Sequence, residues 1–223
     1  MFDSVTVVGR GRVGTAVLER LRERGVDVRD RGGELVLLCV PDAAISEAAR
    51  QIPLGPWVAH VSGATPLAAL DPHVDRFGVH PLQTFTRRRG AEQLDGAWAA
   101  ITAHTDEASA RGFWLAETLG LRPFELPDEL RTLYHAGAAI ASNYLVTLFR
   151  AASSLLEQAG APPEALIPLM RRVIDNGFEL TGPIERGDWA TVTAHLEAIH
   201  EHAPALEPMY RALADLTAEA AAR

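Results

Sequence analysis

A short apolar run followed by three spaced glycines constrains the fold of this chain more than any other feature. Val5 to Val8 has the composition of a buried strand, and Gly9, Gly11 and Gly14 follow it in G-x-G-x-x-G spacing before a helix-like segment. In this context the first glycine makes a tight turn, the second lets a pyrophosphate approach the backbone, and the third lets the helix pack closely on the strand. The helix N-terminus adds free amide groups and a partial positive charge. We predict a dinucleotide site here; the alternative is that the glycines only make a tight turn.

The first 126 residues alternate strand-like runs with helix-length segments. The strand-like runs are residues 5–8, 35–40, 57–61, 77–79, 98–101 and 121–126, and the helix-like segments include 13–24 and 43–51. Strands separated by helices favour a mostly parallel sheet with helices on both faces. We therefore predict that residues 1–126 form an α/β domain with a doubly wound, Rossmann-like sheet.

From Pro127 onward the strand signals stop, and Ala, Leu and Glu dominate. Pro127 precedes two acidic residues, as at a helix start, and Gly160 precedes two prolines, as at a helix end. This pattern predicts one long helix over 127–159. Further helices are predicted over 163–180, 188–202 and 203–221, so residues 127–223 are predicted to form an all-helical domain.

The second predicted strand ends in Val26 to Arg31, the place where such folds usually bind the adenosine ribose. An acidic residue at this position would accept hydrogen bonds from the ribose of NAD, whereas an arginine would pair with the 2′-phosphate of NADP. Arg31 or Arg29 favours NADP, with solvated strand-end charges as the alternative. Only Gly32-Gly33 separate Arg31 from the next apolar run, although a parallel crossover normally needs about a dozen residues. One helix–strand unit is predicted to be missing, which would leave the adenosine pocket open on one side and cofactor affinity low or lost.

Charge, cysteine content and hydropathy exclude several classes of protein. Lys+Arg 21 minus Asp+Glu 29 gives a net charge of −8, which disfavours nucleic acid and anionic lipid as partners. The single Cys39 cannot form an intrachain disulfide, which favours a reducing compartment. No apolar stretch approaches the ~20 residues that span a bilayer, and the first residues lack a basic leader. We expect a cytoplasmic protein with no nucleic-acid or membrane partner.

Several segments resemble the Rossmann-like proteins that carry the domain of unknown function 2520. They are Gly9–Gly14, Cys39-Val40-Pro41-Asp42-Ala43-Ala44-Ile45, His60-Val61-Ser62-Gly63-Ala64, Gly78-Val79-His80-Pro81-Leu82-Gln83-Thr84-Phe85, and His135 through Asn143-Tyr144-Leu145. These proteins belong to the 6-phosphogluconate dehydrogenase-like group, with the pyrroline-5-carboxylate, ketopantoate and prephenate reductases or dehydrogenases. The resemblance implies an NAD(P)-binding domain and an oxidoreductase activity. It also implies a helical C-terminal domain that lines the substrate cleft and builds a homodimer.

Reductases of this group need a proton donor beside the substrate. All 21 basic residues are arginines, so lysine is excluded from this role. His80 falls at the end of a predicted strand, where doubly wound sheets bind their ligands, and is the first candidate.

His135 and Asn143 are eight residues apart, so they share one face of the predicted long helix. In the functional interpretation His135 donates a proton and Asn143 holds the substrate or the nicotinamide amide. The alternative is that both side chains make structural hydrogen bonds to the first domain.

The turn after the predicted strand at residues 57–61 offers amides and hydroxyls to a cofactor through Ser62, although Thr65 is better explained as the cap of a helix that begins at Pro66. Asp42 follows Val40-Pro41 at a cofactor-contacting strand end, or it caps a helix at Ala43. The cofactor-binding residues that we predict are Gly9, Arg10, Gly11, Arg12, Val13, Gly14, Arg31, Val40, Pro41 and Ser62.

Two further groups of side chains invite a functional interpretation. Arg87-Arg88-Arg89 either steers an acidic substrate or a phosphate, or forms a solvated surface, which is the commoner case. His195, His200 and His202 lack the i, i+4 spacing of a helical metal site, and no clear carboxylate partner completes a site, so no metal is predicted.

The leading hypothesis is an NAD(P)-dependent oxidoreductase that uses NADP (or NAD) to reduce a small carbonyl or imine substrate, with His80 or His135 as the acid. The first alternative is a catalytically degenerate Rossmann-like protein that binds a metabolite or a protein partner, which the shortened segment and the absence of lysine favour. The second alternative is a dimeric assembly module whose helices serve mainly as an interface.

Overall fold

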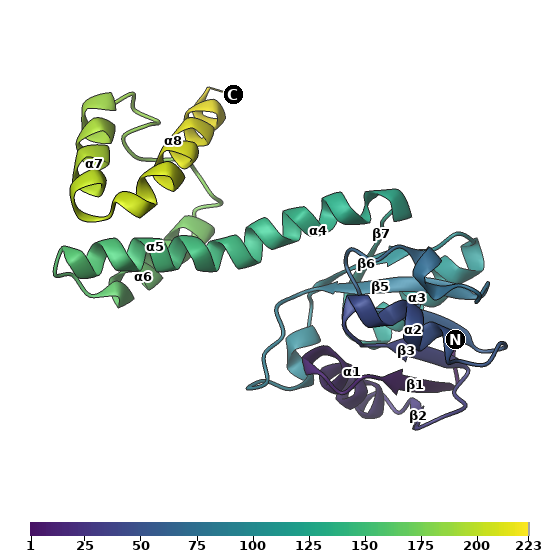
Figure 1. The fold of residues 1–223 in the computed structure, drawn as a ribbon. Coiled ribbons are helices and arrows are strands. Elements are labelled where there is room, and N and C mark those ends of the chain that lie inside the picture. The colour runs from purple at the N-terminus through teal and green to yellow at the C-terminus, as the bar shows by residue number, and fades with distance from the viewer. Residues whose placement is uncertain (223) are drawn as a thin grey trace. The chain divides into compact units, whose positions relative to one another are not determined.

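The computed structural model describes residues 1–222, and the chain divides into two compact units (Figure 1). We call them the sheet unit, Met1–Ser142, and the helical unit, Asn143–Arg223. The predicted division at 126/127 follows the last strand, whereas the compact units divide at 142/143. The reason is that the helix after the last strand sends Arg131 against two interior strands, beside Gly78 and Thr102, where it is fully buried.

A seven-stranded sheet forms the centre of the sheet unit, in the order β2-β1-β3-β4-β5-β6-β7. The strands are β1 (Ser4–Val8), β2 (Asp27–Arg29), β3 (Leu35–Leu38), β4 (Trp57–His60), β5 (Arg76–Leu82), β6 (Trp98–Thr102) and β7 (Arg122–Glu125). Neighbouring strands are parallel except β5 and β6, which are antiparallel. The predicted Rossmann-like, mostly parallel sheet is confirmed.

Helices cover the two faces of this sheet unequally. The helices of the sheet unit are α1 (Arg12–Glu23), α2 (Ile45–Arg50), α3 (Asp106–Thr118) and α4 (Arg131–Ala139). One face packs side chains such as Val5, Leu37 and Phe77 against α1 and α3 in the larger core. The other face packs Val36 and Leu38 against α2 and the 3-10 helix Leu67–Leu70 in a smaller core. The alternation of side chains along each strand separates these two cores.

The connection from β2 to β3 replaces the missing helix–strand unit with five residues, Asp30–Glu34. The two strands lie on opposite sides of β1 and pair with it at neighbouring residues, because Arg29 lies opposite Thr6 and Leu35 lies opposite Val5. The connection therefore only has to cross the face of β1. The prediction that this half of the fold is shortened is confirmed.

The predicted long helix over 127–159 is interrupted. A 3-10 turn, Asp128–Leu130, leads into α4, and a π-helix, Ile140–Tyr144, separates α4 from α5 (Leu145–Gln158). The helical unit continues with α6 (Leu166–Asp175), α7 (Trp189–His202) and α8 (Glu207–Ala221). The helix predicted to reach residue 180 ends at Asp175, because Gly177 and Phe178 adopt positive φ angles of 68° and 62°. Within residues 1–222 no helix is long and apolar enough to cross a membrane.

Candidate active site

The glycines after β1 have different roles. Gly9 has a φ of +102°, and a Cβ there would lie 2.4 Å from the carbonyl oxygen of Cys39. A Cβ on Gly14 would lie 2.1 Å from the carbonyl oxygen of Gly9. A Cβ on Gly11 would meet no atom within 4 Å. Gly9 and Gly14 therefore let β1, the turn and α1 pack closely, whereas Gly11 faces open space.

The N-terminus of α1 leaves its amides free for an anion. The N-cap is Gly11, which has no side chain to accept a hydrogen bond from them, and the first turn, Arg12-Val13-Gly14, contains no acidic residue. Such a helix end attracts anions through its amides and its dipole. Val40 and Pro41 follow β3 beside this turn, since a Cβ on Gly9 would lie 3.2 Å from the Val40 nitrogen. The open space at Gly11 and the free amides fit the pyrophosphate of a dinucleotide.

A cavity of about 130 Å³ adjoins the same helix end. Its lining residues are Gly11, Arg12, Thr15, Ala16, Thr86, Arg87 and Arg89. The guanidinium of Arg12 also donates to the Phe85 carbonyl at 3.4 Å, which joins α1 to the loop after β5. Two of the three consecutive arginines thus lie beside the α1 N-terminus, as their functional interpretation requires. Arg89 also forms an ion pair of 3.4 Å with Glu92.

The charged residues around the end of β2 differ in how they are paired. Arg29 forms an ion pair of 2.7 Å with Asp27, and Arg10 lies 3.5 Å from Asp30. Among residues 1–222, Arg31 has no carboxylate partner and no side-chain hydrogen bond. Arg31 is therefore the cation at this strand end that is free to pair with a phosphate.

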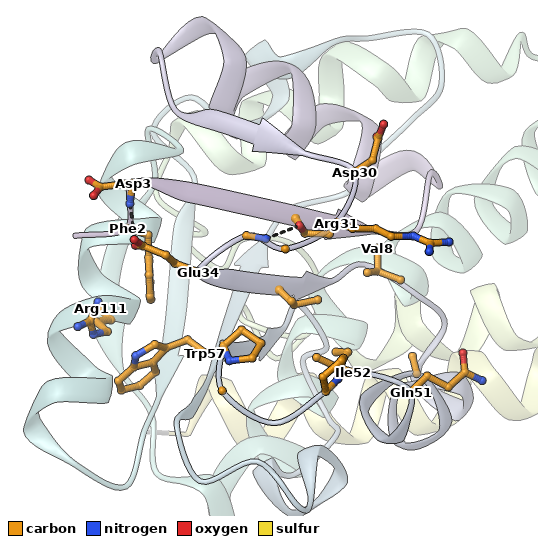
Figure 2. A pocket seen from close by; sticks show the side chains of 18 of the residues that line it. Phe2, Asp3, Val8, Asp30, Arg31, Glu34, Gln51, Ile52, Trp57 and Arg111 are labelled. Atoms are coloured by element: carbon orange, nitrogen blue, oxygen red, sulfur yellow. Dashed lines mark hydrogen bonds between the residues drawn. The ribbon is translucent and has the colours of Figure 1, made fainter.

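A groove of about 1310 Å³ lies on the sheet face beside Arg31 (Figure 2). Thr6, Val8 and Val36 from β1 and β3 contribute to its lining, together with Ile52 and Trp57. Figure 2 shows Arg31 extended across this groove toward Val8, from the connection that replaces the missing helix. The sheet face next to the predicted adenosine position is thus open.

A cluster of titratable side chains lies where β4 and β5 meet α4. His60 ends β4, His80 lies near the end of β5, and Tyr134 and His135 come from α4. Nδ1 of His80 and the hydroxyl of Tyr134 are 2.8 Å apart. The rings of His80 and His135 lie edge to face with centroids 6.0 Å apart. The structure thus brings the predicted His80 and His135 together.

The backbone of Gly63 packs directly against these rings. A Cβ at this position would lie 2.6 Å from Cδ2 of His135 and 2.8 Å from Nε2 of His80. Any other residue at position 63 would push both imidazoles out of their positions. The glycine of the Ser62-Gly63-Ala64-Thr65 turn therefore belongs to the site.

Burial and neighbouring cations keep two of these histidines neutral. Burial, with the charges of Arg131 and His80, lowers the pKa of His60 to about 3. Burial, with the charges of His135 and Arg131, lowers the pKa of His80 to about 4, and Asp42 opposes this shift. Burial raises the pKa of Tyr134 to about 12. At neutral pH His60, His80 and Tyr134 are all uncharged.

Arg131 connects α4 to the sheet. Its guanidinium is 1% exposed, donates to Thr102 Oγ1 at 2.6 Å and to the Ser62 carbonyl, and lies 4.0 Å from Asp128. Its Nε has no hydrogen-bond partner among residues 1–222, and neither has Nε2 of the fully buried His60. This buried cation fixes the start of the helix that carries Tyr134 and His135.

Sequence reasoning missed His60, Arg131 and Tyr134 as parts of the site. Two signals were available: His60 ends a predicted parallel strand just as His80 does, and Arg131 and Tyr134 are four and one residues before His135 on the same helix. Nothing local indicated that Arg131 would be buried.

Two capping predictions were wrong. Thr65 does not cap a helix from Pro66; instead the Leu67 amide donates to both carboxylate oxygens of Asp128 at 3.1 Å, a contact between distant segments. Asp42 does not cap a helix at Ala43, because the 3-10 helix Asp42–Ala44 begins at Asp42 itself, and the Ala44 amide donates to the Pro41 carbonyl.

The remaining predicted site residues have distinct environments. The Ser62 hydroxyl stays within its own turn, where it donates to Thr65 Oγ1 at 2.8 Å and accepts from the Thr65 amide at 3.0 Å. Asn143 lies in the π-helix, a distortion that is frequent at functional sites, and its side chain is exposed. We predicted that Asn143 shares one helix face with His135. The two residues belong to different units, so this stays a prediction.

His195 and His200 have partners in the helical unit. The Nδ1 atom of His195 lies 2.8 Å from the Tyr210 hydroxyl, and that of His200 lies 2.9 Å from Glu207. Over the described residues 1–222, no group of three or more His, Cys, Asp or Glu side chains is arranged to hold a metal ion.

Comparisons with known proteins identify relatives of this chain. The family model described as Domain of unknown function (DUF2520) matches residues 97–217. No curated protein matches the sequence. Protein TM1727 from Thermotoga maritima is 25% identical with a TM-score of 0.80, over 98% of this chain and 100% of its own. BF3122 from Bacteroides fragilis, a candidate NADP oxidoreductase, is 20% identical with a TM-score of 0.79, over 97% of this chain and 98% of its own.

A third relative has been solved with a nucleotide. The reductive aminase from Aspergillus terreus, in complex with NADPH and ethyl-5-oxohexanoate, is 13% identical with a TM-score of 0.68. This match covers 99% of the present chain and 94% of the aminase. The likenesses establish a shared fold, and oxidoreductases are among the proteins that have it.

Proposed function

The chain belongs to the DUF2520 family, and from this premise we propose that it is an NAD(P)-dependent oxidoreductase of a small carbonyl or imine substrate, with NADP as the preferred nucleotide. One observation carries the proposal: Gly11 faces open space at an α1 N-terminus whose amides are free. The relatives named as an NADP oxidoreductase and as an NADPH-bound reductive aminase support it.

Different residues of this chain would bind different parts of the nucleotide. Gly9, Gly11 and Gly14 with the amides of Arg12 and Val13 would hold the pyrophosphate, and Arg10 and Arg12 would add positive charge beside it. Arg31 would pair with the 2′-phosphate, because it is the unpaired cation at the end of β2. Val40, Pro41 and Ser62 would border the nicotinamide end. When bound, the reduced nicotinamide supplies a hydride.

The acid of the reaction would come from the cluster beside Gly63. The chain has no lysine, so the candidates are His80 and His135, which the structure places side by side. Asn143 would hold the substrate or the nicotinamide amide. Nε2 of His80 has no hydrogen-bond partner among residues 1–222 and is not one of the buried unpaired atoms, so a small carbonyl or imine would have access to it.

Titration of the protein with NADPH and NADH, followed by nucleotide fluorescence, tests this function. We expect saturable micromolar binding with NADPH preferred, and loss of binding in Gly11→Asp, which places a carboxylate where the pyrophosphate would lie. Gln158→Glu adds the same charge at an exposed position of the helical unit and should bind as the wild type does. Absence of binding up to millimolar nucleotide would overturn the proposal.

The second candidate is a catalytically degenerate protein with the same fold that binds a metabolite or a protein partner. The five-residue connection from β2 to β3 favours it, because the groove beside Arg31 is left open. Absence of nucleotide binding in a folded protein would select this candidate.

We also propose that the protein forms a homodimer through its helical unit. The helices would then serve as the interface of the dimeric assembly module that the sequence left as an alternative. Helix α6 buries only Leu166, while Ile167, Leu169, Val173 and Ile174 are exposed. Contiguous exposed apolar side chains mark interaction surfaces. Sedimentation should show a dimer that Val173→Glu converts to a monomer, whereas Arg171→Glu on the same helix should not. A monomeric wild-type protein would contradict this proposal.

A further inference from the structure

We propose that Tyr134 positions His80 as a neutral hydrogen-bond donor, with its Nε2–H presented beside Gly63, and that the site consequently reduces a carbonyl rather than an imine. This inference rests on the proposed function and names its substrate class. It assigns a positioning role to Tyr134, a residue on α4 that the sequence motifs did not single out.

The two nitrogens of His80 have different surroundings. Nδ1 lies 2.8 Å from the Tyr134 hydroxyl, and the two rings meet edge to face at 5.5 Å. Nε2 has no hydrogen-bond partner among residues 1–222, yet it is not one of the buried unpaired atoms. It also packs beside the backbone of Gly63, where a Cβ would lie 2.8 Å from it. Nε2 is thus the nitrogen that a small substrate can reach.

The groups facing His80 keep it uncharged and keep the phenol protonated. His60 from β4 and Arg131 and His135 from α4 are its basic neighbours, and Asp42 is the acidic residue whose charge acts against them. The pKa of His80 falls to about 4, while that of Tyr134 rises to about 12. Both are therefore neutral near pH 7.

The direction of the His80–Tyr134 hydrogen bond follows from the partners available. The phenol hydrogen of Tyr134 has no other acceptor among residues 1–222, so donation to Nδ1 satisfies it. A neutral imidazole that accepts at Nδ1 carries its hydrogen on Nε2. Tyr134 thereby selects the tautomer whose donor is the accessible Nε2.

This pair suits the reduction of a carbonyl. When bound, the nicotinamide would supply a hydride to the carbonyl carbon, and the Nε2–H of His80 would stabilise the negative charge that develops on oxygen as the π pair of the C=O bond moves to it. The oxygen takes the Nε2 proton, Nδ1 takes the phenol proton, and water reprotonates the phenolate. His80 is neutral before and after, and the transfer is favourable because an alkoxide is a far stronger base than a phenolate.

The reduction of an imine requires a stronger acid than the reduction of a carbonyl. Its nitrogen must be protonated before a hydride adds readily, and a neutral imidazole N–H is too weak an acid to protonate it. A site for imines would need a charged acid at neutral pH, whereas His80, which accepts the phenol hydrogen at Nδ1, is uncharged. The neutral pair therefore selects aldehydes, ketones or keto acids as substrates.

The protonation state can be read without a substrate, from long-range ¹H–¹⁵N NMR spectra of the histidine-labelled protein at pH 7, with His80 assigned through His80→Gln. We expect His80 to be neutral and protonated on Nε2 in the wild type, and to become a tautomer mixture in Tyr134→Phe. The matched control is Tyr210→Phe, because Tyr210 lies the same 2.8 Å from Nδ1 of His195 and should affect only that histidine. An imidazolium, a proton on Nδ1, or an unchanged signal in Tyr134→Phe would overturn the inference.

A second measurement tests the substrate class. With NADPH, a panel of keto acids and aldehydes should be reduced in preference to cyclic imines, and Tyr134→Phe should lower kcat about 100-fold or more while NADPH affinity is unchanged. Preference for the imines would overturn the inference. Because the NMR result needs no nucleotide, failure of the tautomer assignment is distinguishable from failure of the oxidoreductase proposal, which is decided by NADPH binding.

Discussion

Gly33 lies directly on the backbone of Thr6. Its amide donates to Thr6 Oγ1 at 3.1 Å, and a Cβ on Gly33 would lie 2.7 Å from the Thr6 nitrogen. The next amide, that of Glu34, donates to Ser4 Oγ at 3.2 Å. Ser4 and Thr6 are buried on one face of β1, and their hydroxyls accept the hydrogen bonds of the connection that replaces a helix. This contact explains how five residues can join two strands on opposite sides of β1.

Replacing Gly33 by alanine should destabilise the sheet unit. The new Cβ would collide with the backbone of β1, which cannot move aside, so we expect a loss of about 2 kcal/mol or more in the free energy of unfolding. Urea denaturation followed by tryptophan fluorescence measures this loss. Gly137→Ala is the control, because a Cβ there meets no atom within 4 Å and alanine is favoured inside a helix. Equal stability of Gly33→Ala and the wild type would contradict the close contact.

Substitutions of the glycines in the turn after β1 should distinguish a glycine that is needed for folding from one that is needed for ligand binding. Gly14→Ala should lower the melting temperature markedly, since its Cβ would lie 2.1 Å from the Gly9 carbonyl oxygen. Gly11→Asp should melt at or above the wild-type temperature, because aspartate is a preferred N-cap and Gly11 caps α1. Thermal melts followed by circular dichroism test both variants. An unfolded Gly11→Asp protein would show that Gly11 is needed for packing rather than for a ligand.

Arg31 should determine the preference between nucleotides. Replacing it by alanine removes the unpaired cation beside the 2′-phosphate position, so NADPH should bind about 10- to 100-fold more weakly while NADH is unaffected. Arg29→Ala provides the comparison, because Arg29 is already paired with Asp27 at 2.7 Å. Equal losses for NADPH in the two variants would place the 2′-phosphate elsewhere.

Acid should destabilise the sheet unit below about pH 6.5. The folded-state pKa values of His60 and His80 are about 3 and about 4, below the ordinary value of 6.5. Between these values and 6.5 the unfolded chain binds more protons, so stability is present above pH 6.5 and is lost as the pH falls toward 4. Each histidine contributes up to about 1.4 kcal/mol per pH unit in this window. Urea denaturation at a series of pH values measures the slope.

Two matched variants test whether His60 causes this pH dependence of the stability. His60→Asn should flatten the slope, because the asparagine oxygen can replace Nδ1 as acceptor of the Ser62 amide, 3.2 Å away, without titrating. His202→Asn changes an exposed histidine of the helical unit and should leave the slope as it is. A slope that survives His60→Asn unchanged would assign the acid sensitivity to other groups.

The features that the sequence predicted well depend on residues close together in the chain. The G-x-G-x-x-G spacing located the turn between β1 and α1, and hydrophobic periodicity placed the strands and most helices. The short distance from Arg31 to the next apolar run predicted the missing unit, because chain length alone limits what can fit between two strands. The π-helix and the early end of α6 were missed, since backbone geometry there carries no periodic signal.

The sequence by itself thus determined the architecture and the glycine turn, because spacing and chain length act locally. Only the tertiary structure decided which side chains meet and how they are protonated. His80 and Tyr134 are 54 residues apart in the chain, yet their side chains share a hydrogen bond. Likewise Asp128, not Thr65, binds the Leu67 amide across 61 residues. Burial and the charge of Arg131 lower the pKa of His80, and both arise from packing between distant segments. The chemistry of the site therefore follows from the environment that the fold builds around residues whose identities the sequence supplies.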